Sequence, residues 1–209
     1  MSPHSPKSII QRSACVILAA GAATRFGGDK LSALLHDQML GLYAAQTIAA
    51  LGFGHVVAVC DPAQTALNDA YRALGIEIIA NARPDAGQSA SLHLGIAALA
   101  LHSPASIMIT LADMPFVTAT HLQALYLAFY AAGRSRSVAS HNGDAQLPPA
   151  ILPETLYRSL AEPQFLAQPD QGAKSYLADA IMVHGDADML RDIDRADQLA
   201  ALNISDELV

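Results

Sequence analysis

Short apolar runs alternate with longer segments of helical periodicity along the first two thirds of the chain. The apolar runs are continuous, which is typical of strands buried on both faces of a parallel sheet. They cover residues 14–19, 55–60, 76–81, 105–113 and 137–141. Between them, apolar residues recur three and four positions apart, and this pattern predicts helices at 37–52, 62–75, 89–102 and 118–133. Gly52 is expected to end the first of these helices, and Thr118 to cap the last.

The repeated strand–helix–strand order predicts an α/β fold. Right-handed crossovers make such a fold doubly wound, with a mostly parallel sheet and helices on both faces. Beyond residue 140 the pattern is less regular. There it predicts short helices at 148–162 and 171–179, short strands at 181–185 and 190–194, and a closing helix at 195–203.

A chain of 209 residues is long enough for one domain with a substantial core. Residues 1–13 are polar and are expected to form a flexible tail, and residues 14–209 to form a single domain, because no internal repeat or low-complexity linker interrupts them. No signal peptide is recognisable, and the apolar segments are too short to span a membrane. Cys15 and Cys60 lie in apolar runs and are expected to be buried free thiols of a cytoplasmic protein.

The amino-acid composition limits the kinds of molecule that the protein is expected to bind. Apolar residues make up 52% of the chain and charged residues 15%, as in a compact globular protein. The net charge of −7 argues against a nucleic-acid partner, because phosphate backbones select basic surfaces. A small phosphorylated ligand is compatible with this charge, since a local pair of basic residues and a metal ion can hold it.

The loop LAAGAATRFGGDK, which closes the first predicted strand, is rich in small residues and ends in two basic ones, Arg25 and Lys30. In a doubly wound sheet, ligands bind outside the carboxyl ends of the strands, and small residues there let backbone N–H groups approach a phosphate. Neither a Walker loop nor a dinucleotide fingerprint fits, because Phe26 stands five positions after Gly21 and Ala23 two positions after it. The next basic residue after Lys30 is Arg72, so the pair stands out as a candidate phosphate site.

This loop resembles the Leu-Ala-Ala-Gly-x-x-x-Arg-x-Gly-x-x-Lys signature of MobA-like NTP transferases, and it is closest to their molybdenum cofactor cytidylyltransferases. The resemblance implies the Rossmann-like fold of nucleotide-diphospho-sugar transferases. It also implies that Arg25 and Lys30 are catalytic and bind the triphosphate. The remaining nucleotide-binding positions that it implies are Leu18, Ala19, Ala20, Gly21, Asn81, Gly87, Ser89 and Ser91. Ser89 is equally well placed to cap the helix that follows it.

The segment TLADMP resembles the family's Gly-Asp-Met-Pro segment, with Ala112 in place of the glycine. The resemblance implies that Asp113 binds Mg²⁺, a hard cation that prefers oxygen ligands. The segment DIDRADQL is similar to the family's closing segment, and there either Asp192 or Asp194 could complete the metal site. Asp194 is the preferred metal ligand, with a cap of the last helix as its alternative role.

Two segments resemble the family's acceptor side. In PDQGAKSYL the matching residues are Asp170, Gly172 and Lys174, and in QLPPAILP the matching residue is Pro149. In the second segment, Leu147 and Pro148 stand where cytidylyltransferases of the family usually carry Gly-His or Gly-Asn before the proline.

The implied activity is Mg²⁺-dependent transfer of CMP from CTP to the phosphate of molybdopterin, with release of pyrophosphate. A phosphate acceptor needs no general base, and none of the eight histidines lies in a recognised motif. Two alternatives stay open: cytidylyl or guanylyl transfer to another phosphorylated acceptor, such as a sugar phosphate or methylerythritol phosphate, and a non-catalytic nucleotide-binding role in cofactor insertion. The implied protein partners are a molybdoenzyme or an insertion chaperone.

Overall fold

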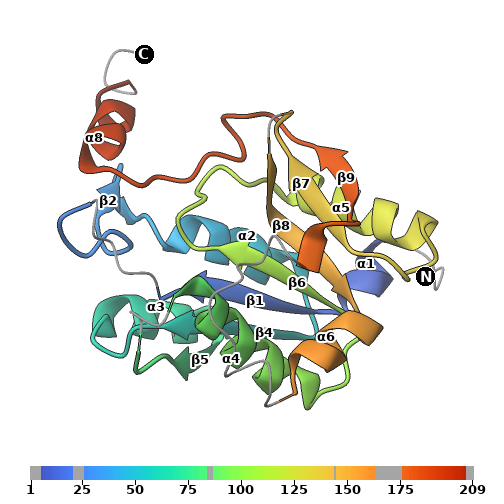
Figure 1. The fold of residues 1–209 in the computed structure, drawn as a ribbon. Coiled ribbons are helices and arrows are strands. Elements are labelled where there is room, and N and C mark those ends of the chain that lie inside the picture. The colour runs from blue at the N-terminus through green and yellow to red at the C-terminus, as the bar shows by residue number, and fades with distance from the viewer. Residues whose placement is uncertain (1–5, 21–25, 84–86, 144, 163–175, 206–209) are drawn as a thin grey trace.

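A computed structural model of the chain describes residues 6–20, 26–83, 87–143, 145–162 and 176–205. Within these ranges, seven strands form one sheet in the order β5-β4-β1-β6-β8-β7-β9 (Figure 1). The strands are β1 (Ala14–Ala19), β4 (His55–Cys60), β5 (Glu77–Ala80), β6 (Ser106–Leu111), β7 (Val138–His141), β8 (Gln146–Pro153) and β9 (Ile181–His184). Strand β8 is antiparallel to both β6 and β7, and the other neighbouring pairs are parallel. The expected mostly parallel sheet is confirmed.

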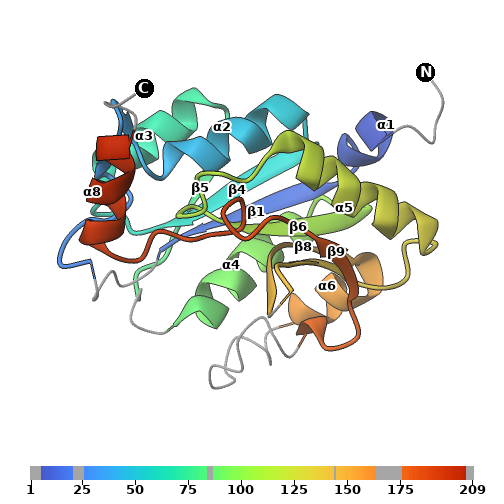
Figure 2. The ribbon, with the colours of Figure 1, turned by 90° about the horizontal axis from the view of Figure 1, so that it is seen from above.

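Helices cover both faces of this sheet, as Figure 2 shows. One face carries α1 (Pro6–Ile10), α2 (Leu42–Leu51), α3 (Thr65–Ala73) and α5 (Ala119–Ala131). The other face carries α4 (Gln88–Ala100) and α6 (Glu154–Leu160). The closing helix α8 (Ala196–Ser205) instead packs against the small hairpin of β2 (Leu34–Leu35) and β3 (Gln38–Met39). The doubly wound arrangement follows from these two layers.

Alternation along β1 divides the core between the two layers. Cys15 and Ile17 face the cluster that contains α2 and α5, whereas Val16 and Leu18 face the cluster that contains α4. All six residues of β1 are buried, which explains why the strand appears as a continuous apolar run in the sequence. Both cysteines are free and buried, as expected.

The predicted helix ends are confirmed at two positions. Gly52 follows α2 with a φ of 74°, in the left-handed region that glycine adopts without strain. The Thr118 hydroxyl accepts a hydrogen bond from the backbone N–H of His121 at 3.2 Å and caps α5.

Three predicted elements differ from the structure. The helix expected at 37–52 starts only at Leu42, because Gln38 and Met39 pair with β2. The segment 148–162 is helical only from Glu154, since residues 146–153 form β8 between two other strands. Residues 190–194 form no strand, because the backbone bond from Ile193 to Asp113 is isolated and belongs to no ladder.

The flexible tail expected at residues 1–13 is wrong for residues 6–13. Residues 6–10 form α1, in which Ile9 and Ile10 are 7% and 1% exposed and belong to the core cluster under α5. The Ser13 hydroxyl then donates to the Ile9 carbonyl at 3.0 Å and lies 2.8 Å from the Ser106 hydroxyl. The neighbours of these two isoleucines in the sequence are mostly polar, so the sequence pattern does not reveal their burial, which results from tertiary packing. Nowhere in the described ranges is a helix long and apolar enough to cross a bilayer.

Replacing Gly95 by alanine is expected to destabilise the protein. Gly95 lies on the face of α4 that packs on β1 and β4, and an added Cβ would lie 2.6 Å from Val16 Cγ1 and 3.0 Å from Val59 Cγ2. Overpacking of this kind costs about 1–3 kcal/mol, whereas helix propensity alone would stabilise the alanine variant by about 1 kcal/mol. The free energy of unfolding in urea measures the net effect.

The control is Ala98→Gly, a change in the same helix at a half-buried position. It should lower the free energy of unfolding by about 1 kcal/mol through propensity. A Gly95→Ala protein that is as stable as the wild type, or more stable, would contradict the close packing of α4 on the sheet.

Candidate active site

The candidate site lies where β1 and β6 end side by side. Strands β4 and β5 extend the sheet on the far side of β1, and β8, β7 and β9 extend it on the far side of β6, so chain connections leave this pair in opposite directions. The pairing of the two strands continues past β6, since the Ala112 N–H donates to the Leu18 carbonyl at 3.1 Å. Crevices at such switch points are the usual ligand sites of doubly wound sheets.

Lys30 reaches this edge from the segment that follows the small-residue loop. Leu31 is buried in the core, and its carbonyl accepts a hydrogen bond from the Gly41 N–H at 3.0 Å. The Lys30 carbonyl accepts from Ala33 N–H at 3.2 Å. The backbone of Lys30 is therefore held in a turn, and its side chain is only 13% exposed. Its ammonium group donates to Asp113 Oδ2 at 2.6 Å and to Asp194 Oδ1 at 2.9 Å.

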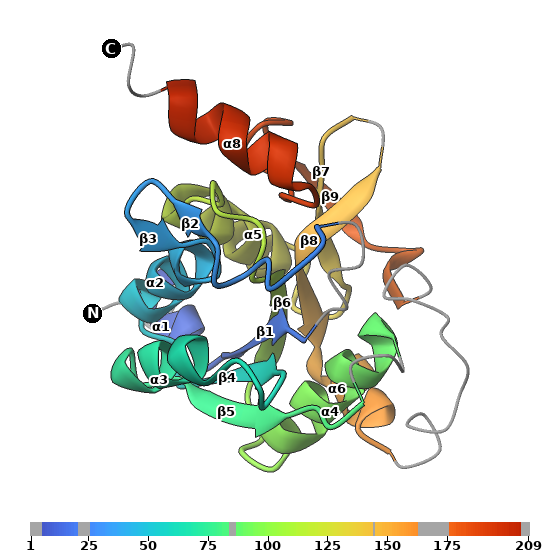
Figure 3. The same ribbon diagram turned by 90° about the vertical axis from the view of Figure 1, so that its left-hand side faces the viewer.

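The segment around Ile193 brings two acidic residues to Asp113 from 80 positions further along the chain. The Ile193 N–H donates to the Asp113 carbonyl at 3.0 Å. The Ile193 side chain is fully buried in a small cluster with Leu35, Leu40 and Leu199 from the hairpin region and α8. Figure 3 shows α8 and this hairpin next to each other at one end of the sheet.

Asp113, Asp192 and Asp194 form an acidic cluster at this point, in which one carboxylate oxygen of each lies within 4.8 Å of the others. Within the described part of the chain, Asp113 Oδ1 is buried and has no hydrogen-bond partner. A buried carboxylate oxygen without a partner is costly, so this atom is suited to a cation. Oxygen ligands in this number fit a hard divalent cation. Sequence reasoning named both Asp192 and Asp194, and the structure brings both to Asp113.

Charge and burial oppose each other in the cluster. Burial raises the pKa of the Asp113 carboxyl, and the positive charge of Lys30 lowers it. The negative charges of Asp192 and Asp194 raise it further, and the resulting pKa lies above the ordinary value of 3.8. Burial lowers the pKa of Lys30, but Asp113 and Asp194 more than offset this, and the net result lies above 10.5. The lysine therefore stays charged beside carboxylates that repel one another.

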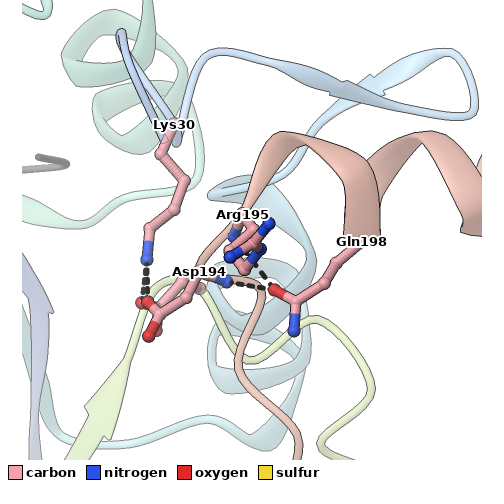
Figure 4. A network of polar contacts seen from close by, with 5 residues as sticks. Lys30, Asp194, Arg195 and Gln198 are labelled. Carbon is pink, nitrogen blue, oxygen red and sulfur yellow. Dashed lines mark hydrogen bonds and ion pairs between the residues drawn. The ribbon is translucent and has the colours of Figure 1, made fainter. Parts of the chain in front are cut away.

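Gln198 is a site residue that sequence reasoning missed. Its side-chain oxygen accepts hydrogen bonds from the N–H groups of Asp194 and Arg195, both at 2.9 Å, at the start of α8 (Figure 4). Gln198 therefore caps α8, which was the alternative role considered for Asp194. The Asp194 carboxylate accepts a hydrogen bond from Lys30. A glutamine in the first turn of a helix is the sequence signal that could have revealed it.

The predicted nucleotide residues Asn81 and Ser91 contact each other under the end of β1. The Asn81 side-chain amide donates to the Ser91 hydroxyl at 2.9 Å, and that hydroxyl donates to the Ala20 carbonyl at 3.4 Å. Both side chains are buried, as are Leu18, Ala19 and Ala20. These bonds fix the backbone at the start of the small-residue loop. Direct contact of these residues with a nucleotide stays a prediction.

Helix α4 starts at Gln88, and its N-cap is Gly87, whose φ of 90° favours glycine. Ser89 lies inside the helix and is buried, so its alternative role as the N-cap is wrong. On the acceptor side, Pro149 is buried in β8, and its carbonyl accepts a hydrogen bond from the Ser140 hydroxyl at 2.8 Å. The other predicted site residues lie outside the described ranges: Gly21, Arg25, Asp170, Gly172 and Lys174.

The mostly parallel sheet, with a lysine and an acidic cluster at its switch point, has the Rossmann-like fold of nucleotidyltransferases. The chain belongs to the family of the MobA-like NTP transferase domain, whose model matches residues 15–186. The resemblance seen in the small-residue loop is thereby confirmed. A comparison with curated proteins gave no match.

Solved structures share the fold at low sequence identity. Rv0371c from Mycobacterium tuberculosis is 19% identical, with a TM-score of 0.73 over 93% of this chain and 99% of its own, and a second structure of that protein is a complex with manganese. Molybdopterin-guanine dinucleotide biosynthesis protein A from Archaeoglobus fulgidus is 21% identical, with a TM-score of 0.66 over 94% and 100%. A 4-diphosphocytidyl-2C-methyl-D-erythritol synthase from Anaerococcus prevotii is 12% identical, with a TM-score of 0.71 over 93% and 98%.

The raised pKa of Asp113 predicts a distinctive pH dependence of stability. When the folded pKa lies above the unfolded value of 3.8, the folded protein binds the proton first, so acidification through this window stabilises it. The Asp113→Asn protein lacks this contribution. The wild type is therefore expected to gain unfolding free energy relative to Asp113→Asn as the pH falls from neutral toward 3.8.

Urea unfolding with a metal chelator present, at a series of pH values, measures this difference. Asp69→Asn is the matched control, because Asp69 is 75% exposed on α3 and pairs only with Arg72 among the described residues. A difference between wild type and Asp113→Asn that stays constant with pH, or falls with acid, would contradict the assigned charge balance.

Proposed function

We propose that this protein is a Mg²⁺-dependent cytidylyltransferase that joins CMP from CTP to the phosphate of molybdopterin and releases pyrophosphate. The family membership supports nucleotidyl transfer. The observation that carries the proposal is the convergence of Lys30 with Asp113, Asp192 and Asp194 at the switch point of the sheet. One positive side chain and three carboxylates at one point can neutralise a phosphate and bind its counter-cation together.

In the proposed reaction, an oxygen of the acceptor phosphate forms a bond to the α-phosphorus of CTP, and the bond from that phosphorus to the β-phosphate oxygen breaks. A phosphate monoester has its second pKa near ~6, so it is already ionised at neutral pH and needs no base. The chain's task is then to align the reactants and offset the negative charge. The Lys30 ammonium would stabilise the charge that builds on the α-phosphate oxygens.

The residues suited to hold Mg²⁺ are Asp113, with its buried unpartnered oxygen, and Asp194, with Asp192 beside them. When bound, the cation supplies further positive charge to the phosphate oxygens. Arg25, which lies outside the described ranges, is proposed to bind the β- and γ-phosphates. Ile193 and Gln198 hold the backbone on both sides of Asp194, and they would thereby fix the direction of its carboxylate.

The choice of CTP rests on the start of the small-residue loop. Guanylyl-type members of the family more often carry Leu-Ala-Gly-Gly, whereas this chain carries Leu-Ala-Ala-Gly, and Ala20 is buried and tied to Ser91 through its carbonyl. In this proposal, the Ala20 methyl group would occupy space that the larger purine base needs. Guanylyl transfer is therefore the less favoured alternative.

The acceptor has one specific rival. Leu147 and Pro148 replace the polar pair that cytidylyltransferases of the family usually carry, and Pro149 is buried. A fold neighbour is named a 4-diphosphocytidyl-2C-methyl-D-erythritol synthase, which supports a phosphorylated polyol as the second candidate. With molybdopterin as acceptor, the protein partners would be a molybdoenzyme or an insertion chaperone, and the reaction would take place in the cytoplasm.

Lys30→Ala and Asp113→Ala are each expected to reduce turnover by about 10²–10³, the usual cost of removing one electrostatic contact to the transition state. Pyrophosphate release measures turnover, and circular dichroism checks that both proteins are folded. The matched control is Arg72→Ala, which removes a basic side chain that is 58% exposed on α3 and should leave turnover unchanged. Near-normal turnover in either site variant would refute the role assigned to that residue.

A panel of CTP and GTP against molybdopterin, sugar phosphates and methylerythritol phosphate identifies the substrates. Fast pyrophosphate release is expected only with CTP and molybdopterin. Release with CTP and methylerythritol phosphate instead would establish the rival acceptor. Nucleotide binding without release in any pairing would show a non-catalytic role and overturn the proposal.

A further inference from the structure

Lys30 contacts two of the carboxylates that would bind the cation. Its ammonium group lies 2.6 Å from Asp113 Oδ2 and 2.9 Å from Asp194 Oδ1, so it bridges the two residues. These three side chains come from separate parts of the sequence and meet at one point. The Lys30 ammonium therefore offsets part of the negative charge of the acidic cluster.

An ammonium group and a divalent cation compete for the negative charge of these carboxylates. Asp113 Oδ2 and Asp194 Oδ1 already accept from Lys30, and two positive charges a few ångströms apart repel each other. The Lys30 side chain is 13% exposed, which limits screening by water. Cation binding at the cluster is therefore expected to weaken the contact of Lys30 with at least one carboxylate.

We infer that Lys30 is an internal competitor of the divalent cation, and that it couples cation binding to nucleotide binding. This inference rests on the proposed function in taking the acidic cluster as the cation site. Without nucleotide, the Lys30 ammonium holds the carboxylates and keeps cation affinity low. When a triphosphate arrives, its oxygens offer Lys30 a new partner, and the carboxylates become accessible to the cation.

The coupling is reciprocal, as linkage requires. A cation at the cluster weakens the contacts of Lys30 with the carboxylates, and the freed ammonium group raises affinity for the phosphates. Each ligand therefore binds more tightly when the other is present, so the protein binds cation and nucleotide together in preference to either one alone. It also keeps the three carboxylates close together in the protein without ligands, because the ammonium offsets their repulsion.

Titration with Mn²⁺ alone, with no nucleotide present, gives the first measurement. Electron paramagnetic resonance of free Mn²⁺ reports its dissociation constant for the wild type and for Lys30→Met. Removal of the competing ammonium is expected to tighten Mn²⁺ binding by about tenfold or more. Arg195→Met is the matched control, since Arg195 follows Asp194 but pairs with Asp197, and it should change Mn²⁺ affinity by less than about threefold.

Lysine labelling gives the second measurement. The sequence holds lysine only at positions 7, 30 and 174, so mass spectrometry resolves each after reaction with acetic anhydride. Lys30 is expected to react slowly in the wild type with a chelator present. Mn²⁺ alone, or the substitution Asp194→Asn, should each raise the Lys30 rate several-fold, with Lys7 as the internal standard.

Tighter Mn²⁺ binding by Lys30→Met together with faster labelling of Lys30 in Mn²⁺ supports the competition. Equal or weaker Mn²⁺ binding by Lys30→Met overturns it, because Lys30 would then only organise the carboxylates. Absence of Mn²⁺ binding by both proteins overturns it as well, together with the proposed metal site. Neither measurement depends on CTP or the acceptor, so a wrong substrate assignment shows up only in the pyrophosphate assay.

Discussion

The hydrogen bond from the Ile193 N–H to the Asp113 carbonyl is the contact on which the candidate site depends. It joins the segment that precedes α8 to the end of β6, in the middle of the sheet. The bond is stable in this place because the Ile193 side chain is buried with Leu35, Leu40 and Leu199. Asp192 and Asp194 flank this buried residue, and one carboxylate oxygen of each lies within 4.8 Å of one of Asp113.

The cluster that results is held together against its own repulsion. Three carboxylates gather here, burial penalises the charge of Asp113, and Lys30 offsets part of the negative charge. Active sites commonly sacrifice stability in this way, because the groups that bind a substrate's charge are unfavourable without it. Capping of α8 by Gln198 and the buried turn at Leu31 are the rigid supports that hold these charges in place.

The central sheet could be predicted from the sequence because β1, β4 and β6 are buried on both faces and appear as continuous apolar runs. The hairpin of β2 and β3 could not, because two-residue strands carry no periodicity and are held by contacts with α8. Lys30 and Asp113 were found through a motif. The sequence could not decide whether Asp192 or Asp194 joins Asp113 in the metal site, because their positions depend on the burial of Ile193. Both lie beside Asp113 in the structure.

The small cluster around Ile193 also has a consequence for synthesis of the protein. Two of the three carboxylates reach Asp113 only after α8 has packed on the hairpin formed by residues 34–39. A ribosome-bound chain that already contains the whole central sheet therefore still lacks the acidic cluster. The acidic cluster is therefore complete only once the segment around Ile193 has been made and packed against the sheet.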